Sequence, residues 1–185
     1  GGMPYVTKEM IATGVTAPNW GCRAPLEAVA RPATVVCRLA DAGASLIGTS
    51  EMTELAYEPS GLNSVRGNVL NPWNFDIVPG GSSSGSAALV AAGCCFAALG
   101  SDTGGSVRIP AHCCGVTSLK PSWGSLPLDG TMKLAPSLDT IGVFARSAAD
   151  VALVWDALSG QGATASSWPY AGVIFDDAFA VCDVE

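Results

Sequence analysis

An apolar run, residues 87–99, joins two glycine-rich segments: Gly80-Gly81-Ser82-Ser83-Ser84-Gly85-Ser86 and Gly100-Ser101-Asp102-Thr103-Gly104-Gly105-Ser106-Val107-Arg108. This run suits a short buried helix, so we expect the two glycine-rich segments to fold back toward one another as loops. Glycine and serine linkers do not normally flank a continuous apolar run, which argues against two flexible linkers. The stretch therefore predicts one site rich in hydroxyl groups.

Composition narrows the class of protein. The chain has 185 residues, 49% of them hydrophobic, so it can bury a core as one domain. Its formal net charge is −7 and it has nine lysines and arginines. Since phosphate neutralisation needs clustered cations, we expect no direct binding of nucleic acid.

The longest apolar run, residues 87–99, is shorter than the roughly 20 residues of a membrane-spanning helix. No basic segment followed by an apolar one opens the sequence, so we expect no membrane span and a cytoplasmic location. The seven cysteines include the adjacent pairs Cys94-Cys95 and Cys113-Cys114, which suit neither disulfides nor a zinc site. Most cysteines are expected to be small core residues, and no metal or cofactor is expected.

Strand and helix patterns alternate along the chain and predict an α/β fold. We expect strands within residues 2–9, 45–47, 115–121 and 139–144, a helix from Pro32 to Gly43, and a helix after the capping pair Ser147 and Asp150. Residues 51–79 read as a long ordered loop, and residues 161–185 as a loop-like tail.

A serine nucleophile needs a base, and the chain has one histidine, His112. His112 adjoins Cys113, whereas catalytic partners are usually brought together by the fold, so a structural or tolerated histidine is expected. Lys8 ends an apolar strand and becomes a base if burial neutralises its amine, although an exposed lysine is the alternative on local sequence. A phosphate-binding loop lacks its lysine, because Ser86 follows Gly85.

The sequence resembles the amidase signature family. The resemblance is carried by the motifs at residues 2–9, 80–86, 100–110, 115–122, 137–142 and 145–150, and it covers nearly the whole chain up to about Gly160. It implies a mixed β-sheet core flanked by helices, cut short at both ends relative to the family. We therefore expect an amidase signature core over residues 1–160, with 161–185 leading toward a missing second half.

The resemblance implies a Ser-cisSer-Lys triad. Ser106 would be the nucleophile, Ser82 would relay the proton across a cis peptide bond, and Lys8 would be the terminal base. The backbone N–H groups of residues 103–106 would form the oxyanion hole; these residues are Thr103, Gly104, Gly105 and Ser106. In supporting roles, Ser83 would bond near the lysine, and Asp102 and Arg108 either pair to hold the loop or form a surface salt bridge. Ser84 stands where the family usually has glycine.

The expected activity is hydrolysis of a carboxylic or urea-type amide, with ammonia or an amine released. The alternative is the amidase subunit of a tRNA-dependent amidotransferase, which releases ammonia from glutamine. An inactive scaffold subunit is more remote, because Lys8, Ser82 and Ser106 are all present. The partners expected are a small-molecule amide and either further copies of the chain or the rest of a longer chain.

Overall fold

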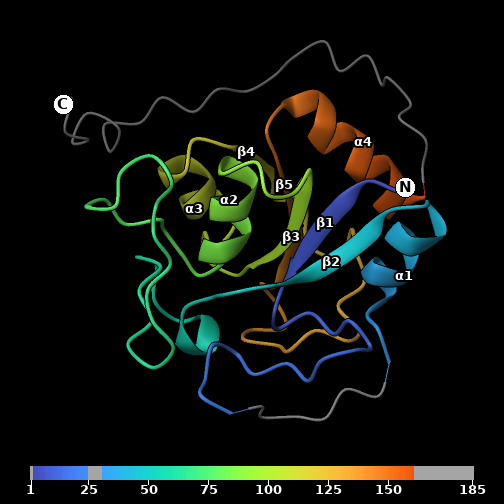
Figure 1. Ribbon diagram of the computed structural model, residues 1–185. Coiled ribbons are helices and arrows are strands. Elements are labelled where there is room, and N and C mark those ends of the chain that lie inside the picture. The colour runs from blue at the N-terminus through green and yellow to red at the C-terminus, as the bar shows by residue number, and fades with distance from the viewer. Residues whose placement is uncertain (1, 25–30, 161–185) are drawn as a thin grey trace.

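A mixed five-stranded sheet forms the centre of the computed structural model, which describes residues 2–24 and 31–160 (Figure 1). The elements, in chain order, are β1 (Pro4–Lys8), α1 (Thr34–Asp41), β2 (Ser45–Ser50), the 3₁₀ helix η1 (Glu54–Ala56), α2 (Ser84–Ala91), β3 (Ala97–Asp102), α3 (Arg108–Cys113), β4 (Thr117–Leu119), β5 (Thr140–Ala145) and α4 (Ala148–Ser159). The strand order is β2-β1-β3-β5-β4. β1 pairs in parallel with β2 and β3, whereas β5 is antiparallel to β3 and β4. The α/β prediction is confirmed.

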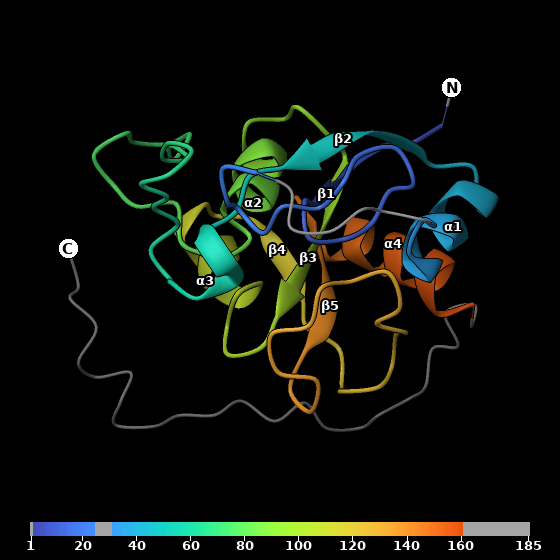
Figure 2. The same ribbon diagram turned by 90° about the horizontal axis from the view of Figure 1, so that it is seen from below.

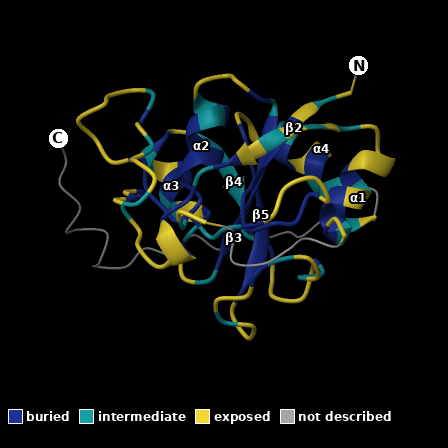
Figure 3. Cartoon of the chain, turned by 60° about the horizontal axis from the view of Figure 1, so that its bottom comes forward, coloured by how far each residue is buried: buried dark blue, intermediate teal, exposed yellow. Residues whose placement is uncertain are grey.

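Helices cover both faces of the sheet, with α1 and α4 on one side and α2 and α3 on the other (Figures 1 and 2). Alternation along the strands divides the core accordingly. Tyr5 and Leu99 pack with α1 and α4, while Val6 and Ala98 pack with α2 and α3. The central strands β1, β3 and β5 are therefore buried on both faces, whereas β2 is partly exposed. Most other exposed residues lie in the loops and on the outer helix surfaces (Figure 3).

The apolar run of residues 87–99 is not one helix. α2 begins inside the first glycine-rich segment at Ser84, and the chain turns at Gly93, which has a φ of +72°. The end of the run belongs to β3, the strand that pairs with β1 and β5. The expectation that the whole second glycine-rich segment is a loop is thus wrong for residues 100–102, which end β3.

Other expected elements are present with shifted ends. α1 begins at Thr34 rather than at Pro32, since the Asp129 carboxylate accepts hydrogen bonds from the Thr34 N–H and hydroxyl. This capping group comes from a distant segment, which local sequence does not indicate. The capping pair is present: Ser147 Oγ accepts from the Asp150 N–H and donates to its carboxylate. The predicted loop of residues 51–79 contains only η1.

The cysteine prediction is only partly right. Cys95 and Cys114 are buried, Cys22 and Cys113 are half-buried, and Cys37 and Cys94 are exposed, all as free thiols. Among the described residues, most cysteines are therefore not core residues. None of the described helices has the length and apolar character needed to cross a membrane. The predicted tail, residues 161–185, lies outside the described residues.

Candidate active site

The predicted site lies at the carboxyl ends of β1, β2 and β3. Because these strands are parallel, their last residues, Lys8, Ser50 and Asp102, meet at one edge of the sheet. The loop before α2 reaches the same edge, where the Ser83 N–H donates to the Ser106 carbonyl at 3.2 Å. The two glycine-rich segments thus meet as expected. An open α/β sheet commonly places its ligands at this edge.

Lys8 is fully buried at the end of β1. Its Nζ donates to Ser82 Oγ at 2.6 Å and to Ser101 Oγ at 2.9 Å. Burial lowers the pKa of Lys8 to about 7, although the nearby Asp102, Asp139 and Glu9 carboxylates act in the opposite direction. The alternative of an exposed lysine is therefore wrong, and the amine is partly neutral at neutral pH.

The two serines that follow Gly81 take different roles. The Gly81–Ser82 peptide bond is cis, as the resemblance implies, and the Ser82 hydroxyl is buried against Lys8. Ser83 contacts the lysine only indirectly: its Oγ donates to the Ser101 carbonyl at 3.2 Å and accepts from the Ser101 N–H at 3.4 Å. This approach needs glycine at 100, since a Cβ there would lie 2.7 Å from Ser83 Oγ.

Ser84, where the family usually has glycine, is the first residue of α2. The side chain is buried and its Oγ has no hydrogen-bond partner among the described residues. Helical backbone accommodates a Cβ without strain. The departure from the family pattern therefore leaves the start of the helix intact.

Ser101 is a member of the lysine site that sequence reasoning did not single out. Its hydroxyl accepts from Lys8 and donates to Met10 Sδ at 3.0 Å. The signal that could have located Ser101 is its position directly before Asp102 in the second glycine-rich segment. In the structure, Ser101 lies on β3, next to β1. What local sequence does not indicate is that β3 is the strand paired with β1.

Asp102 organises the loop that carries Ser106. Its buried carboxylate accepts from the Gly105 N–H at 2.8 Å and the Val107 N–H at 3.0 Å. The Arg108 guanidinium adds two hydrogen bonds, at 3.1 and 3.0 Å. Burial acts to raise the pKa of Asp102, but the hydrogen bonds from Arg108 and the backbone hold that pKa below its usual range. This pair holds the loop and is more than a surface salt bridge.

Ser106 lies four residues after β3 and two before α3. It is half-buried and lines a cavity of about 290 Å³, together with Thr103 and Gly104, residues 56–59, Ile109 and Leu134. Among the described residues, the Ser106 hydroxyl has no hydrogen bond to Ser82 or to Lys8. The structure therefore brings Lys8 and Ser82 into contact and opens Ser106 to a cavity.

The four predicted oxyanion donors are not equivalent. The Gly105 N–H is engaged by Asp102, and the φ of +129° at this residue requires glycine. Within the described part of the chain, the N–H groups of Thr103, Gly104 and Ser106 have no hydrogen-bond partner. Thr103 is fixed through its side chain, which donates to Asp139 Oδ1 at 2.5 Å. Asp139 is a second residue that sequence reasoning left without a role.

His112 is exposed on α3. It has no hydrogen bond to the predicted catalytic residues, in agreement with its interpretation as a structural or tolerated residue.

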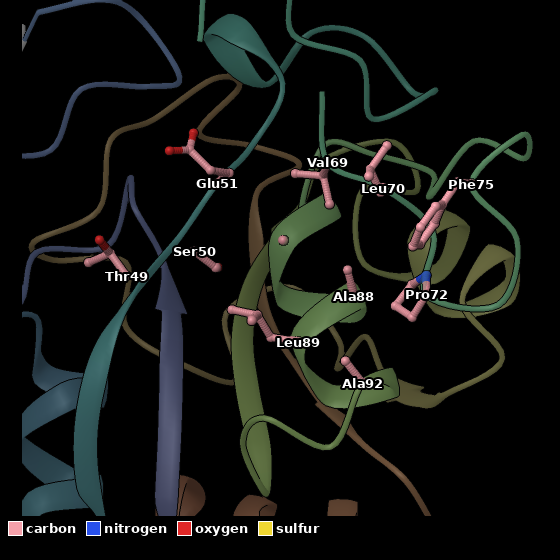
Figure 4. A pocket seen from close by; sticks show the side chains of 11 residues that line it. Thr49, Ser50, Glu51, Val69, Leu70, Pro72, Phe75, Ala88, Leu89 and Ala92 are labelled. Carbon is pink, nitrogen blue, oxygen red and sulfur yellow. The ribbon is translucent and has the colours of Figure 1, made fainter. Parts of the chain in front are cut away.

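A larger cavity of about 540 Å³ lies between the ends of β2 and α2 and the loop of residues 69–75 (Figure 4). Val69, Leu70, Phe75 and Leu89 give it mainly apolar walls, and no predicted site residue lines it.

Known proteins are similar to this chain in sequence and in fold. A family profile described as Amidase matches residues 1–178. A glutamyl-tRNA(Gln) amidotransferase chain of Halorhodospira halophila is 47% identical over 161 residues, which cover 86% of this chain and 33% of that protein. The corresponding chain of Deinococcus deserti is 47% identical over 162 residues, with the same coverage. The chain spans about a third of the length of the curated relatives it matches.

Solved structures give the same picture. The peptide amidase from Stenotrophomonas maltophilia superposes with a TM-score of 0.80 at 36% identity, covering 86% of this chain and 34% of that one. An allophanate hydrolase of Kluyveromyces lactis has a TM-score of 0.82 at 32% identity, covering 85% of this chain and 26% of that one. A structure described as an amidase has a TM-score of 0.82 at 39% identity, covering 85% and 36%.

Proposed function

This chain belongs to the amidase family, and from that premise we propose that it hydrolyses a carboxylic or urea-type amide through an acyl-enzyme on Ser106. The observation that carries the proposal is the buried Lys8 amine, with a pKa of about 7 and Ser82 Oγ 2.6 Å away. The neutral amine of a lysine can accept a proton, whereas the charged amine cannot, so a lysine that is partly neutral at working pH can act as a base. Burying it without such a use only costs stability.

In the first step Ser106 Oγ attacks the carbonyl carbon of the amide. The Ser106 proton passes to Ser82 Oγ while the Ser82 proton passes to Lys8 Nζ, so Ser82 ends the step neutral. The carbonyl oxygen becomes an oxyanion. The N–H groups of Thr103, Gly104 and Ser106 are the proposed donors to it, because the Gly105 N–H already binds Asp102.

In the second step the carbon–nitrogen bond breaks and the proton returns from Lys8 through Ser82 to the leaving nitrogen. Ammonia or an amine departs, and Ser106 holds the acyl group as an ester. A water molecule then attacks this ester, again losing its proton toward Lys8. The acid is released and Ser106 regains its hydrogen, so amide and water yield acid and amine.

Labelling with a fluorophosphonate tests this proposal, because the probe reacts with an activated serine and needs no particular amide. We expect one adduct, mapped to Ser106 by peptide mass spectrometry, and none in Ser106→Ala. The labelling rate should rise with pH through about 7, since the neutral form of Lys8 is the base. Lys8→Met should lower the rate by at least a hundredfold.

His112→Ala is the matched control, and its labelling rate should equal that of the wild type. An adduct on a cysteine or on another serine would contradict the assignment of Ser106. A rate that follows a group titrating near 6.5 and disappears in His112→Ala would replace Lys8 by the histidine as the base.

A second candidate is the amidase subunit of a tRNA-dependent amidotransferase. The observation that favours it is the identity of 45–47% with chains named as parts of glutamyl-tRNA(Gln) amidotransferase. Glutaminase activity that increases when a copurifying second subunit is added would establish this candidate. Hydrolysis of other amides by the chain alone, unaffected by a partner, would support the free-standing enzyme.

The remaining features of the proposal concern the chain as a whole. We propose residues 1–160 as the catalytic core, with a small-molecule amide as substrate and with further copies or a longer polypeptide as partners. The proposed location is the cytoplasm. Fractionation of cells that produce the protein with an epitope tag tests this location, and recovery in another fraction would refute it.

A further inference from the structure

Asp139 is a buried carboxylate that the proposed reaction does not use. It lies directly before β5, whose first residue, Thr140, pairs with Asp102 at the end of β3. This pairing brings Asp139 beside the loop that carries the nucleophile. The neighbouring Thr140 hydroxyl donates to the Asp102 carbonyl at 3.0 Å and fixes the register at this point.

The Asp139 carboxylate gathers donors from two segments. Oδ1 accepts from Thr103 Oγ1 at 2.5 Å, and both oxygens accept from the Ala135 N–H at 3.0 Å. Oδ2 also accepts from the Leu134 N–H at 2.9 Å. The side chain thus holds Thr103 and the backbone of residues 134–135 in one arrangement. Both Thr103 and Leu134 line the cavity beside Ser106.

Within the described part of the chain, the Thr103 side chain has no hydrogen bond besides the one to Asp139, whereas Gly105 is held by Asp102. The loop is therefore fixed from two sides, by Asp102 at Gly105 and by Asp139 at Thr103. A hydrogen bond to an ionised carboxylate is stronger than one between neutral groups. The hydrogen bond from Thr103 to Asp139 limits the rotation of Thr103, whose N–H is one of the proposed oxyanion donors.

We propose that Asp139 is a positioning residue that aims the Thr103 N–H at the oxyanion and, through residues 134–135, sets one wall of the catalytic cavity. This inference rests on the proposed acyl-enzyme on Ser106. Asp139 does not contact the reacting atoms in this scheme. It acts through Thr103, and an error of about 1 Å in such a donor is enough to slow the reaction by roughly a hundredfold.

The test uses the maximal rate of fluorophosphonate labelling, separated from the apparent affinity by varying the probe concentration. Asp139→Asn and Thr103→Val should each lower the maximal rate by roughly ten- to a hundredfold with little change in affinity. Thr103→Ser keeps the hydroxyl and should stay within about threefold of the wild type. The double variant Asp139→Asn/Thr103→Val should be no slower than the slower single variant.

Asp129→Asn is the matched control, since Asp129 also accepts from a threonine hydroxyl and N–H, at the start of α1. It should lower Tm and leave the maximal rate unchanged. A maximal rate of Asp139→Asn within twofold of the wild type overturns the inference. So does a Thr103→Ser variant as slow as Thr103→Val.

Failure to fold does not remove the test. If Asp139→Asn does not fold, the pair Thr103→Val and Thr103→Ser still decides it, since valine keeps the shape of threonine without its hydroxyl and serine keeps the hydroxyl. A wild-type chain that gives no adduct on Ser106 overturns the proposed function and this inference together. A labelled wild type with unchanged variants overturns this inference alone.

Discussion

At the scale of single residues, the lysine site places a titratable group where it opposes folding. Lys8 is fully buried, and its pKa of about 7 lies well below its ordinary value because burial disfavours the charged amine. Below pH 7 the folded chain buries the charged amine of Lys8. Between pH 7 and the ordinary lysine pKa, the folded chain has lost the Lys8 proton, whereas the unfolded chain keeps it. In the wild type, the free energy of unfolding therefore rises with pH over this range.

Lys8→Met, which should lower the labelling rate of Ser106 by at least a hundredfold, should also remove this pH dependence. The change in Tm relative to the wild type should be more favourable at pH 6 than at pH 9. Above pH 7, titration of Lys8 changes the free energy of unfolding of the wild type by about 1 kcal/mol per pH unit. This corresponds to a difference of several degrees in Tm between these two conditions. Thermal unfolding in matched buffers measures the difference. An offset in Tm that is the same at both pH values would show that Lys8 does not titrate in this range.

Local sequence left Lys8 open between a base and an exposed lysine. The resemblance to the amidase signature family implied Lys8, Ser82 and Ser106 as candidates, because the motifs that carry it lie within short stretches of sequence. Ser101 and Asp139 were not assigned a role, since each acts on a segment far away in the chain. Ser101 contacts Lys8 across 93 positions, and Asp139 contacts Thr103 across 36. Such contacts depend on which strands pair, and a single sequence does not reveal pairing.

At the scale of elements, the apolar pattern predicted β1, β2, β4 and β5, which lie within or overlap the expected residues, but it missed β3. It failed where one apolar run serves two elements, since a helix and a buried strand need similar residues. The division at Gly93 followed only from the structure. The start of α1 also could not be predicted, because its capping carboxylate, Asp129, comes from another part of the chain.

The long loop of residues 51–79 is attached to the end of β1 by one side chain. Arg66 binds the buried Glu9 carboxylate at 3.1 Å and also pairs with Glu51. Burial raises the pKa of Glu9 to about 7, and Arg66 acts in the opposite direction. Without Arg66 the pKa of Glu9 should rise further, so the folded chain would lose more stability as pH increases past 7.

Arg66→Gln should therefore lower Tm more at pH 8 than at pH 5, where Glu9 is protonated with or without Arg66. At pH 8 we expect a loss of about 1 kcal/mol, or roughly 2 to 4 °C in Tm. The control Lys133→Gln removes the same charge from an exposed side chain and should change Tm little at either pH. Equal losses at pH 5 and pH 8 would show that Arg66 acts only through packing.

At the scale of the whole molecule, the sheet has an open edge at β2. Within the described residues, β2 pairs only with β1, and its outer edge carries no charged residue between Ser45 and Ser50. Ile47 is 55% exposed on this strand, and Leu46 is half-buried beside it. Unpaired, uncharged strand edges favour pairing with another chain, and proteins commonly block them with lysine.

We expect the isolated chain to associate through this edge, with an average mass in light scattering that rises with protein concentration. Ile47→Lys should reduce the association by adding a charge at the edge, at little cost to Tm, since the side chain is largely exposed. Leu153→Lys adds the same charge on the exposed side of α4 and should associate like the wild type. The sheet edge would be excluded as the contact if Ile47→Lys associated as strongly as the control, or if the wild type stayed monomeric at every concentration.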